Sequence, residues 1–153
     1  MAKDKGKKKP QIAAAPPVGK HPVLPSKWPT DKQSNERLSW RLGDMEWDGP
    51  WNWRGIKATK WREIMDLLAD LERLTWGEAC SGGNPRVKIV KVADAPPAIR
   101  DRLEATQRDD ADELVEIRMS GVQRMFGVRR GTVVHLLWWD PTHNAWPAKK
   151  KHT

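Results

Sequence analysis

The stretch that decides the fold comprises ELVEIRM (113–119), SG (120–121), QRMFGVR (123–129), RG (130–131) and TVVHLLWWD (132–140). The three longer segments are rich in Val, Ile, Leu or Trp, which favour β-strands. The two Gly-containing dipeptides between them are typical of tight hairpin turns. The sequence therefore predicts a three-stranded antiparallel meander in the last third of the chain.

Upstream of the meander, the sequence predicts two helices and one more strand. Apolar side chains recur every three or four residues over 59–75, which predicts an amphipathic helix that Gly77 ends. Residues 86–92 predict a strand, and Asp94 is a cap for a second helix that runs through Arg108. We expect an α+β fold in which a small twisted antiparallel sheet packs with two main helices.

The charge distribution predicts three regions. The chain has 153 residues and a formal net charge of +8. Residues 31–148 carry 18 basic and 19 acidic side chains, so the excess lies near the ends. We expect a disordered basic Pro/Lys-rich arm over 1–35, a single domain over 36–148 and a basic tail over 149–153.

Composition excludes several classes of protein. Cys80 is the only cysteine, which excludes a disulfide framework and a Cys-based zinc site. No apolar run approaches the ~20 residues that span a bilayer, and the N-terminus has no apolar signal region. We therefore expect a cytoplasmic protein without a membrane partner. The chain has no Tyr, which excludes any mechanism that needs a tyrosine hydroxyl.

The ten Trp residues include four between positions 40 and 53: Trp40, Trp47, Trp51 and Trp53. They form either a platform on which nucleic-acid bases stack, or a loop that is held on the core by its indoles. The second interpretation is favoured, because most of the Trp side chains are needed for packing in a domain of this size.

The meander carries the candidate nucleic-acid residues. If both Gly dipeptides are two-residue turns, Arg118, Arg129 and Trp138 point outward and Arg124 points toward the core. Arginine and Trp on an exposed sheet face bind phosphate and stack bases. The predicted nucleic-acid-binding residues are Arg129, Arg130, Trp138, Lys149, Lys150 and Lys151.

His143 follows the last predicted strand. An imidazole titrates near neutrality, so this residue is a candidate general acid or base for RNA cleavage; the alternative is that it caps a turn. His135, Asp140 and His143 do not form an open His-rich cluster, and the acidic turn 109–112 lacks the spacing of a calcium loop. We expect neither a metal nor a cofactor.

The pattern Glu116-x-Arg118-x-Ser-Gly-x-x-Arg124-x-x-Gly-x-Arg129, followed by Leu-Leu-Trp-Trp-Asp140-x-x-His143, resembles the RelE/ParE superfamily of bacterial toxins. The resemblance covers about residues 59–143. It implies a RelE-like fold, in which helices pack on a twisted sheet and the meander carries the active face. The chain departs from the family in its long arm, its Trp-rich segment and its lack of Tyr. The segments 39–51 and 136–143 also resemble an uncharacterised prophage-type protein family.

The resemblance implies a toxin of a toxin–antitoxin or prophage system that cleaves RNA without a metal. Its partners would be RNA, at the ribosome or elsewhere, and a protein antitoxin. The catalytic residues would be His143, Arg118 and Arg124. The alternatives are a non-catalytic nucleic-acid-binding or phage accessory protein, and a protein that inhibits a partner enzyme.

Overall fold

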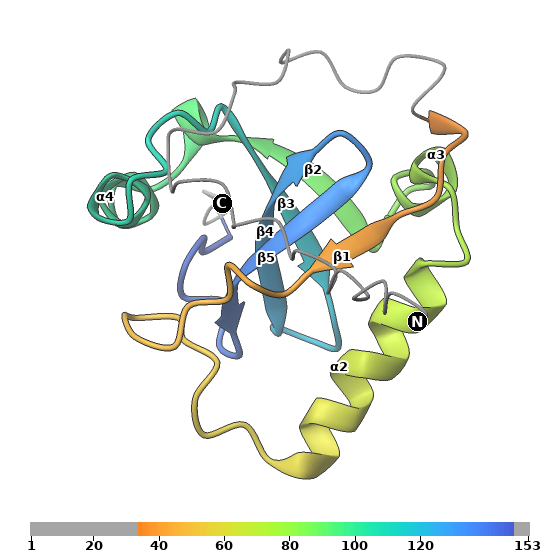
Figure 1. Ribbon diagram of the computed structural model, residues 1–153, viewed down its shortest axis with the longest axis horizontal. Coiled ribbons are helices and arrows are strands. Elements are labelled where there is room, and N and C mark those ends of the chain that lie inside the picture. Colours follow the sequence, from red (N-terminus) through yellow and green to blue (C-terminus); the bar gives the residue numbers. More distant parts are fainter. Residues whose placement is uncertain (1–33, 149–153) are drawn as a thin grey trace, which may run out of the picture.

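The computed structural model describes residues 34–148, which form one five-stranded sheet with helices on both faces (Figure 1). The elements follow in the order β1 (Ser39–Arg41), α2 (Ala58–Leu71), α3 (Trp76–Ala79), β2 (Val87–Lys91), a 3-10 turn (Val92–Asp94), α4 (Pro97–Ala105), β3 (Glu113–Arg118), β4 (Arg124–Arg130) and β5 (Val133–Asp140). Both predicted terminal regions, apart from Ser34 and Asn35, lie outside the described residues.

The strand order in the sheet is β1-β5-β4-β3-β2. The α+β class is confirmed, but the expectation of a purely antiparallel sheet is wrong, because β1 pairs with β5 in parallel. Parallel neighbours need a long connection, and here the connection is most of the domain. A short strand near the start of the chain carries no sequence signal that identifies such a distant partner.

The predicted registers of both hairpins are also wrong. In the first, Arg118 pairs with Arg124 and Met119 bonds to Gln123, so the turn has three residues rather than two. The last hairpin differs as well. Its turn is formed by Gly131 and Thr132, since Arg130 pairs with Val133 and Gly131 has a φ of 63°. An irregularity between Phe126 and Gly127 then shifts the pairing by one more residue. A bulge of this kind changes which side chains point to which face. The bulge therefore determines to which face of the sheet the last side chains of β5 point.

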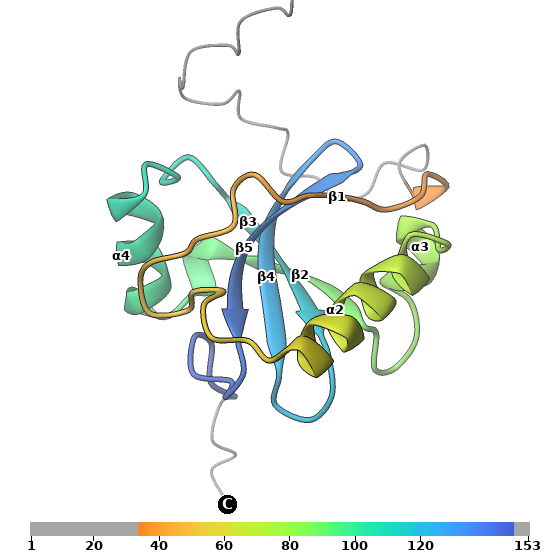
Figure 2. The same cartoon turned by 60° about the horizontal axis from the view of Figure 1, so that its bottom comes forward.

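Helices cover both faces of the sheet, with α2 and α3 on one side and α4 on the other (Figure 2). Ile64, Leu68 and Leu71 of α2 pack on the first face. Ile99 and Leu103 of α4 pack on the second. Because both faces are buried, β5 is apolar along almost its whole length rather than alternating.

The first predicted helix, 59–75, is shorter than expected, and a separate short helix follows it. The amphipathic stripe is confirmed, but α2 ends at Leu71. Thr75 then caps α3, and the side chains of Thr75 and Glu78 form a reciprocal capping box. Gly77 lies inside α3 rather than ending α2, because the Thr-x-x-Glu pattern begins a new helix there.

The Trp-rich segment is largely held on the core, as the favoured interpretation expects. Trp51 and Trp53 are buried, and the half-buried Trp40 donates a hydrogen bond from Nε1 to the Leu68 carbonyl at 3.0 Å. Trp47 is 49% exposed. Three of the four indoles therefore cannot serve as a platform for stacked bases.

We predict that Gly127→Ala lowers the free energy of unfolding by about 1–3 kcal/mol, the usual cost of overpacking. A Cβ at this position would lie 2.6 Å from the backbone oxygen of His135 and 2.7 Å from Cγ1 of Val134. The matched control is Gly83→Ala, where a Cβ would have no neighbour within 4 Å. Urea denaturation of both variants is the measurement. A Gly127→Ala midpoint equal to that of the control would contradict the strand spacing described above.

Candidate nucleic-acid interface

Two of the three predicted catalytic residues lie side by side at one end of the sheet. Arg118 ends β3 and pairs with Arg124, the first residue of β4. Arg124 in turn pairs with Asp140, the last residue of β5. The turn that carries His143 leaves the sheet at this same end, directly after Asp140. We name this set of strand termini the sheet end.

Arg124 is an interior residue of the sheet end. It is 5% exposed, and its Nη1 donates to the carbonyl oxygens of Gly121 and Gln123 at 2.8 Å each. Its Nε lies 3.4 Å from Oε1 of Glu116. These contacts hold the β3–β4 turn in place, and they commit much of the guanidinium to the protein itself.

Arg118 differs from Arg124 in what its side chain contacts. It is half-buried, and no hydrogen bond or ion pair joins its guanidinium to another residue within 34–148. A guanidinium presents five donors in a planar fork that matches a phosphate. Of the two arginines, Arg118 is therefore the one available to an anionic ligand.

His143 lies in a turn that is organised by Asp140. The Asp140 carboxylate is fully buried and accepts backbone hydrogen bonds from Asn144 at 3.0 Å and Ala145 at 2.8 Å. His143 is half-buried and has a φ of 58°, in the left-handed region. The carboxylate thus fixes the backbone on both sides of the imidazole, so His143 is held at the sheet end.

The predicted nucleic-acid-binding residues lie elsewhere. Arg129 and Arg130 are at the opposite end of β4, roughly 20 Å from Arg124 at ~3.3 Å per residue. The Arg129 guanidinium lies 5.7 Å from the ring centroid of Trp76, and burial lowers its pKa, partly opposed by Glu113 and Cys80. Lys149, Lys150 and Lys151 lie outside the described residues.

The expectation that Trp138 points outward is wrong. Its exposure is 0%, and its ring packs against Trp51 at 5.1 Å and Phe126 at 6.2 Å between centroids. Helices cover both faces of the sheet, so Trp138 is buried whichever face it occupies, and the bulge beside Phe126 places it on the face under α4. Its buried Nε1 has no hydrogen-bond partner among the described residues, so the indole contributes through packing alone.

A pocket of about 420 Å³ lies beside the sheet end, between the loop before α2, the start of α2, the turn before β4 and the end of β5. Its lining comprises Pro50, Asn52, Arg54, Gly55, Ile56, Lys57, Thr59, Lys60, Gln123, Trp139 and Pro141. Local sequence patterns do not reveal the pocket, because residues 50–60 and the distant Gln123, Trp139 and Pro141 line it together.

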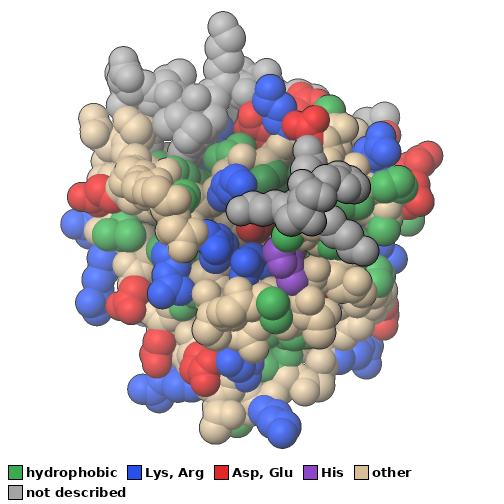
Figure 3. Space-filling model, turned by 180° about the vertical axis from the view of Figure 1, so that it is seen from behind, with side chains coloured by type: hydrophobic (Ala, Val, Ile, Leu, Met, Phe, Trp, Pro, Cys, Tyr) green, Lys and Arg blue, Asp and Glu red, His purple; other side chains and the backbone are tan. Residues whose placement is uncertain are grey.

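The surface mixes both signs of charge. In the view from behind, Lys and Arg side chains gather around a histidine near the centre, while acidic groups lie toward the rims (Figure 3). This agrees with the near balance of charge over residues 31–148. An anion would therefore be held by a local group of cations rather than by the net charge of the domain.

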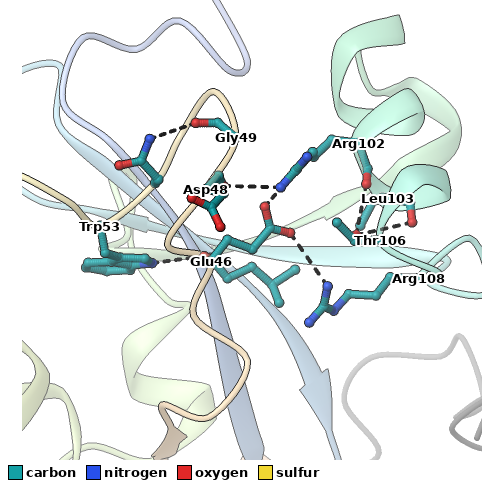
Figure 4. A network of polar contacts seen from close by, with 10 residues as sticks. Glu46, Asp48, Gly49, Trp53, Arg102, Leu103, Thr106 and Arg108 are labelled. Atoms are coloured by element: carbon teal, nitrogen blue, oxygen red, sulfur yellow. Dashed lines mark hydrogen bonds and ion pairs between the residues drawn. The ribbon is translucent and has the colours of Figure 1, made fainter. Parts of the chain in front are cut away.

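A second cluster that local sequence patterns do not reveal is an ion network beside α4 (Figure 4). Arg102 Nε contacts Oε2 of Glu46 at 2.8 Å, and Arg108 Nη1 lies 3.6 Å from Oε1 of the same carboxylate. Arg108 also contacts Asp44, which lies 2.6 Å from Nδ1 of His135. The network joins the loop after β1 to α4 and β5, and its alternating charges neutralise one another.

We predict that the thiol of Cys80 is unreactive in the folded protein. Burial raises its pKa from 9.0 to about 11, although the positive charge of Arg129 lowers it. Only the thiolate is nucleophilic, so alkylation at pH 8 should be about 100-fold slower than in denaturant. Iodoacetamide labelling followed by mass spectrometry is the measurement. Equal rates in buffer and in denaturant would contradict the burial of Cys80.

The same pKa shift fixes the sign of the pH dependence. Because the folded pKa is above the unfolded value, the native state retains a proton that the unfolded state loses. The stability that comes from the buried neutral thiol is present below pH 9 and is lost as the pH rises through about 11.

Comparison of the chain with family models, with curated proteins and with solved structures finds no match. Within the part of the chain that the structure describes, no helix has the length and apolarity needed to cross a bilayer. The same residues contain no group of three or more His, Cys, Asp or Glu side chains placed to hold a metal ion. The function must therefore be argued from the chemistry of the sheet end.

Proposed function

We propose that the protein is a RelE-like toxin of a toxin–antitoxin or prophage system, which cleaves RNA in the cytoplasm without a metal. The observation that carries the proposal is the sheet end, where Arg118 lacks a partner within the described residues and His143 is held in a turn ordered by Asp140. The α+β architecture, with helices packed on a sheet, agrees with the resemblance.

In the proposed reaction, Arg118 and His143 have separate roles. His143 takes the proton of the attacking 2′-hydroxyl and returns it to the 5′ oxygen that leaves, while the new bond to phosphorus forms and the old one breaks. Arg118 donates to the phosphate oxygens on which negative charge develops. Arg124 is a positioning residue, because it orders the turn between β3 and β4.

The test is induction of the full chain in a bacterial host. Growth arrest together with shortened cellular RNA is the expected outcome, and co-expression of a neighbouring antitoxin reading frame should relieve the arrest. Arg118→Lys keeps the charge but loses the planar fork, so it should reduce both effects. If the folded wild-type protein causes neither arrest nor RNA cleavage, the enzyme proposal is wrong.

A non-catalytic nucleic-acid-binding protein is the second candidate. The burial of Arg124 favours it, because only one of the two arginines at the sheet end remains available for chemistry. In that case the purified protein would bind single-stranded RNA and leave it intact. The third candidate, an enzyme inhibitor that acts through a Trp-rich face, has little support because Trp51 and Trp53 are buried.

A further inference from the structure

The pocket beside the sheet end is lined by Arg54, Lys57 and Lys60 and by no carboxylate. Its volume of about 420 Å³ lies in the usual range for small-ligand sites, ~300–1,000 Å³. Asn52, Thr59 and Gln123 add polar groups to the wall. This lining suits a compact anion with several acceptor oxygens.

The three cations are only weakly neutralised by the protein. Arg54 pairs with Asp48 at 3.2 Å, and the Asp48 side chain is 88% exposed. Lys60 pairs with Glu63, whose side chain is 55% exposed. Arg54 Nε also donates to the Trp47 carbonyl, and Lys60 Nζ also donates to Oε1 of Gln123 at 3.2 Å. An ion pair as exposed as that of Arg54 and Asp48 contributes little to stability, so Arg54 can turn to a ligand. The side chain of Lys57 has no hydrogen bond or ion pair to another residue within 34–148.

The start of α2 adds to the positive potential of the pocket. The helix has 14 residues, and its N-cap is Lys57. The Lys57 side chain does not cap the first amides, and the first turn contains no acidic residue. The first amides of a helix have no intrahelical acceptor, and the positive end of the helix dipole disfavours a nearby Lys. An anion in the pocket would accept hydrogen bonds from these amides and would offset the repulsion between Lys57 and the positive end of the helix.

We infer that this pocket binds a phosphate of single-stranded RNA, in addition to the phosphate held at the sheet end. The choice of RNA rests on the proposed function. The pocket lies on the face of the sheet under α2, since Trp139 lines it, whereas Arg118 pairs with Arg124 and lies on the face under α4. A strand of RNA that binds both sites would therefore pass around this end of the sheet.

The first experiment compares two double variants of the full chain, both of which remove two positive charges. Arg54→Gln/Lys57→Gln changes the pocket, and Lys88→Gln/Lys91→Gln changes exposed lysines of β2. Fluorescence anisotropy with a short single-stranded RNA should show about tenfold weaker binding for the pocket variant. The slope of log affinity against log salt should flatten by ~0.7 for each lost phosphate contact. Equal losses in both variants would overturn the inference.

The second experiment locates the ligand. In ¹H–¹⁵N spectra, the amides of residues 58–60 should shift on addition of the RNA, and Lys57→Gln alone should weaken that response. Inorganic phosphate and uridine monophosphate are the competing probes. If inorganic phosphate or uridine monophosphate saturates the shifts of these amides while RNA leaves them unchanged, the pocket is a site for a free phosphate and the inference is overturned. RNA binding by this pocket without cleavage would refute the proposed function and leave the inference standing.

Discussion

His143→Asn is expected to slow RNA cleavage by about 10²- to 10⁴-fold, the typical contribution of a proton-transferring side chain. Asn is chosen because His143 has a φ of 58°, a conformation that Asn adopts more readily than most residues. The variant therefore removes the imidazole and leaves the turn unstrained. The measurement is the initial rate of cleavage of a single-stranded RNA by the purified protein.

The control for His143→Asn is Asn144→Ala. Asn144 is exposed, and its contact with Asp140 is made by the backbone amide, which survives the change. Asn144→Ala should keep its full cleavage rate. If His143→Asn cleaves as fast as wild type while its melting temperature is unchanged, His143 has no part in the reaction.

Trp53→Ala is expected to lower the free energy of unfolding by about 3–5 kcal/mol, as large aromatic truncations in a core do. Trp53 is 1% exposed, and its ring stacks on that of Trp61 with centroids 5.6 Å apart. Its Nε1 also donates to the Leu137 carbonyl at 2.9 Å. The truncation would leave a cavity and remove one of the two hydrogen bonds that the Leu137 carbonyl accepts, since the Glu46 amide still donates to it at 2.9 Å.

The control for Trp53→Ala is Trp47→Ala, which makes the same chemical change six positions earlier in the same loop. Trp47 is 49% exposed, so this change should alter the stability by less than about 0.5 kcal/mol. Denaturant titration of both variants gives the comparison. Similar midpoints for the two variants would mean that the loop after β1 is not part of the core.

The sequence predicts the elements that carry their own periodicity. The stripe of Ile64, Leu68 and Leu71 indicates α2, and alternating or continuous runs of apolar residues indicate β2 to β5. The sequence does not predict the bulge at Gly127, which depends on the close approach of the His135 backbone. The bulge selects the face that Trp138 occupies, and the helices on both faces of the sheet bury it there.

The candidate site is predictable only in part, for a related reason. His143 and Arg118 follow from local pattern, because each lies at the end of a recognisable strand. The pocket and the pairing of His135 with Asp44, 91 residues apart, depend on how separate segments meet. Residue types alone do not predict contacts between segments that are distant along the chain, because a Lys or Asp in a loop is usually solvated.

The parallel pairing of β1 with β5 has a consequence for synthesis. Ser39 pairs with Val133, and Trp53 donates to the carbonyl of Leu137, 84 residues later. Bacterial and eukaryotic ribosomes add ~5–20 residues each second, so the first strand waits for several seconds before its partner emerges. The sheet is complete only when β5 has left the ribosome. A chain that still lacks β5 therefore exposes unpaired apolar surface, and the sheet end with Arg118 and His143 forms only after β5 has emerged.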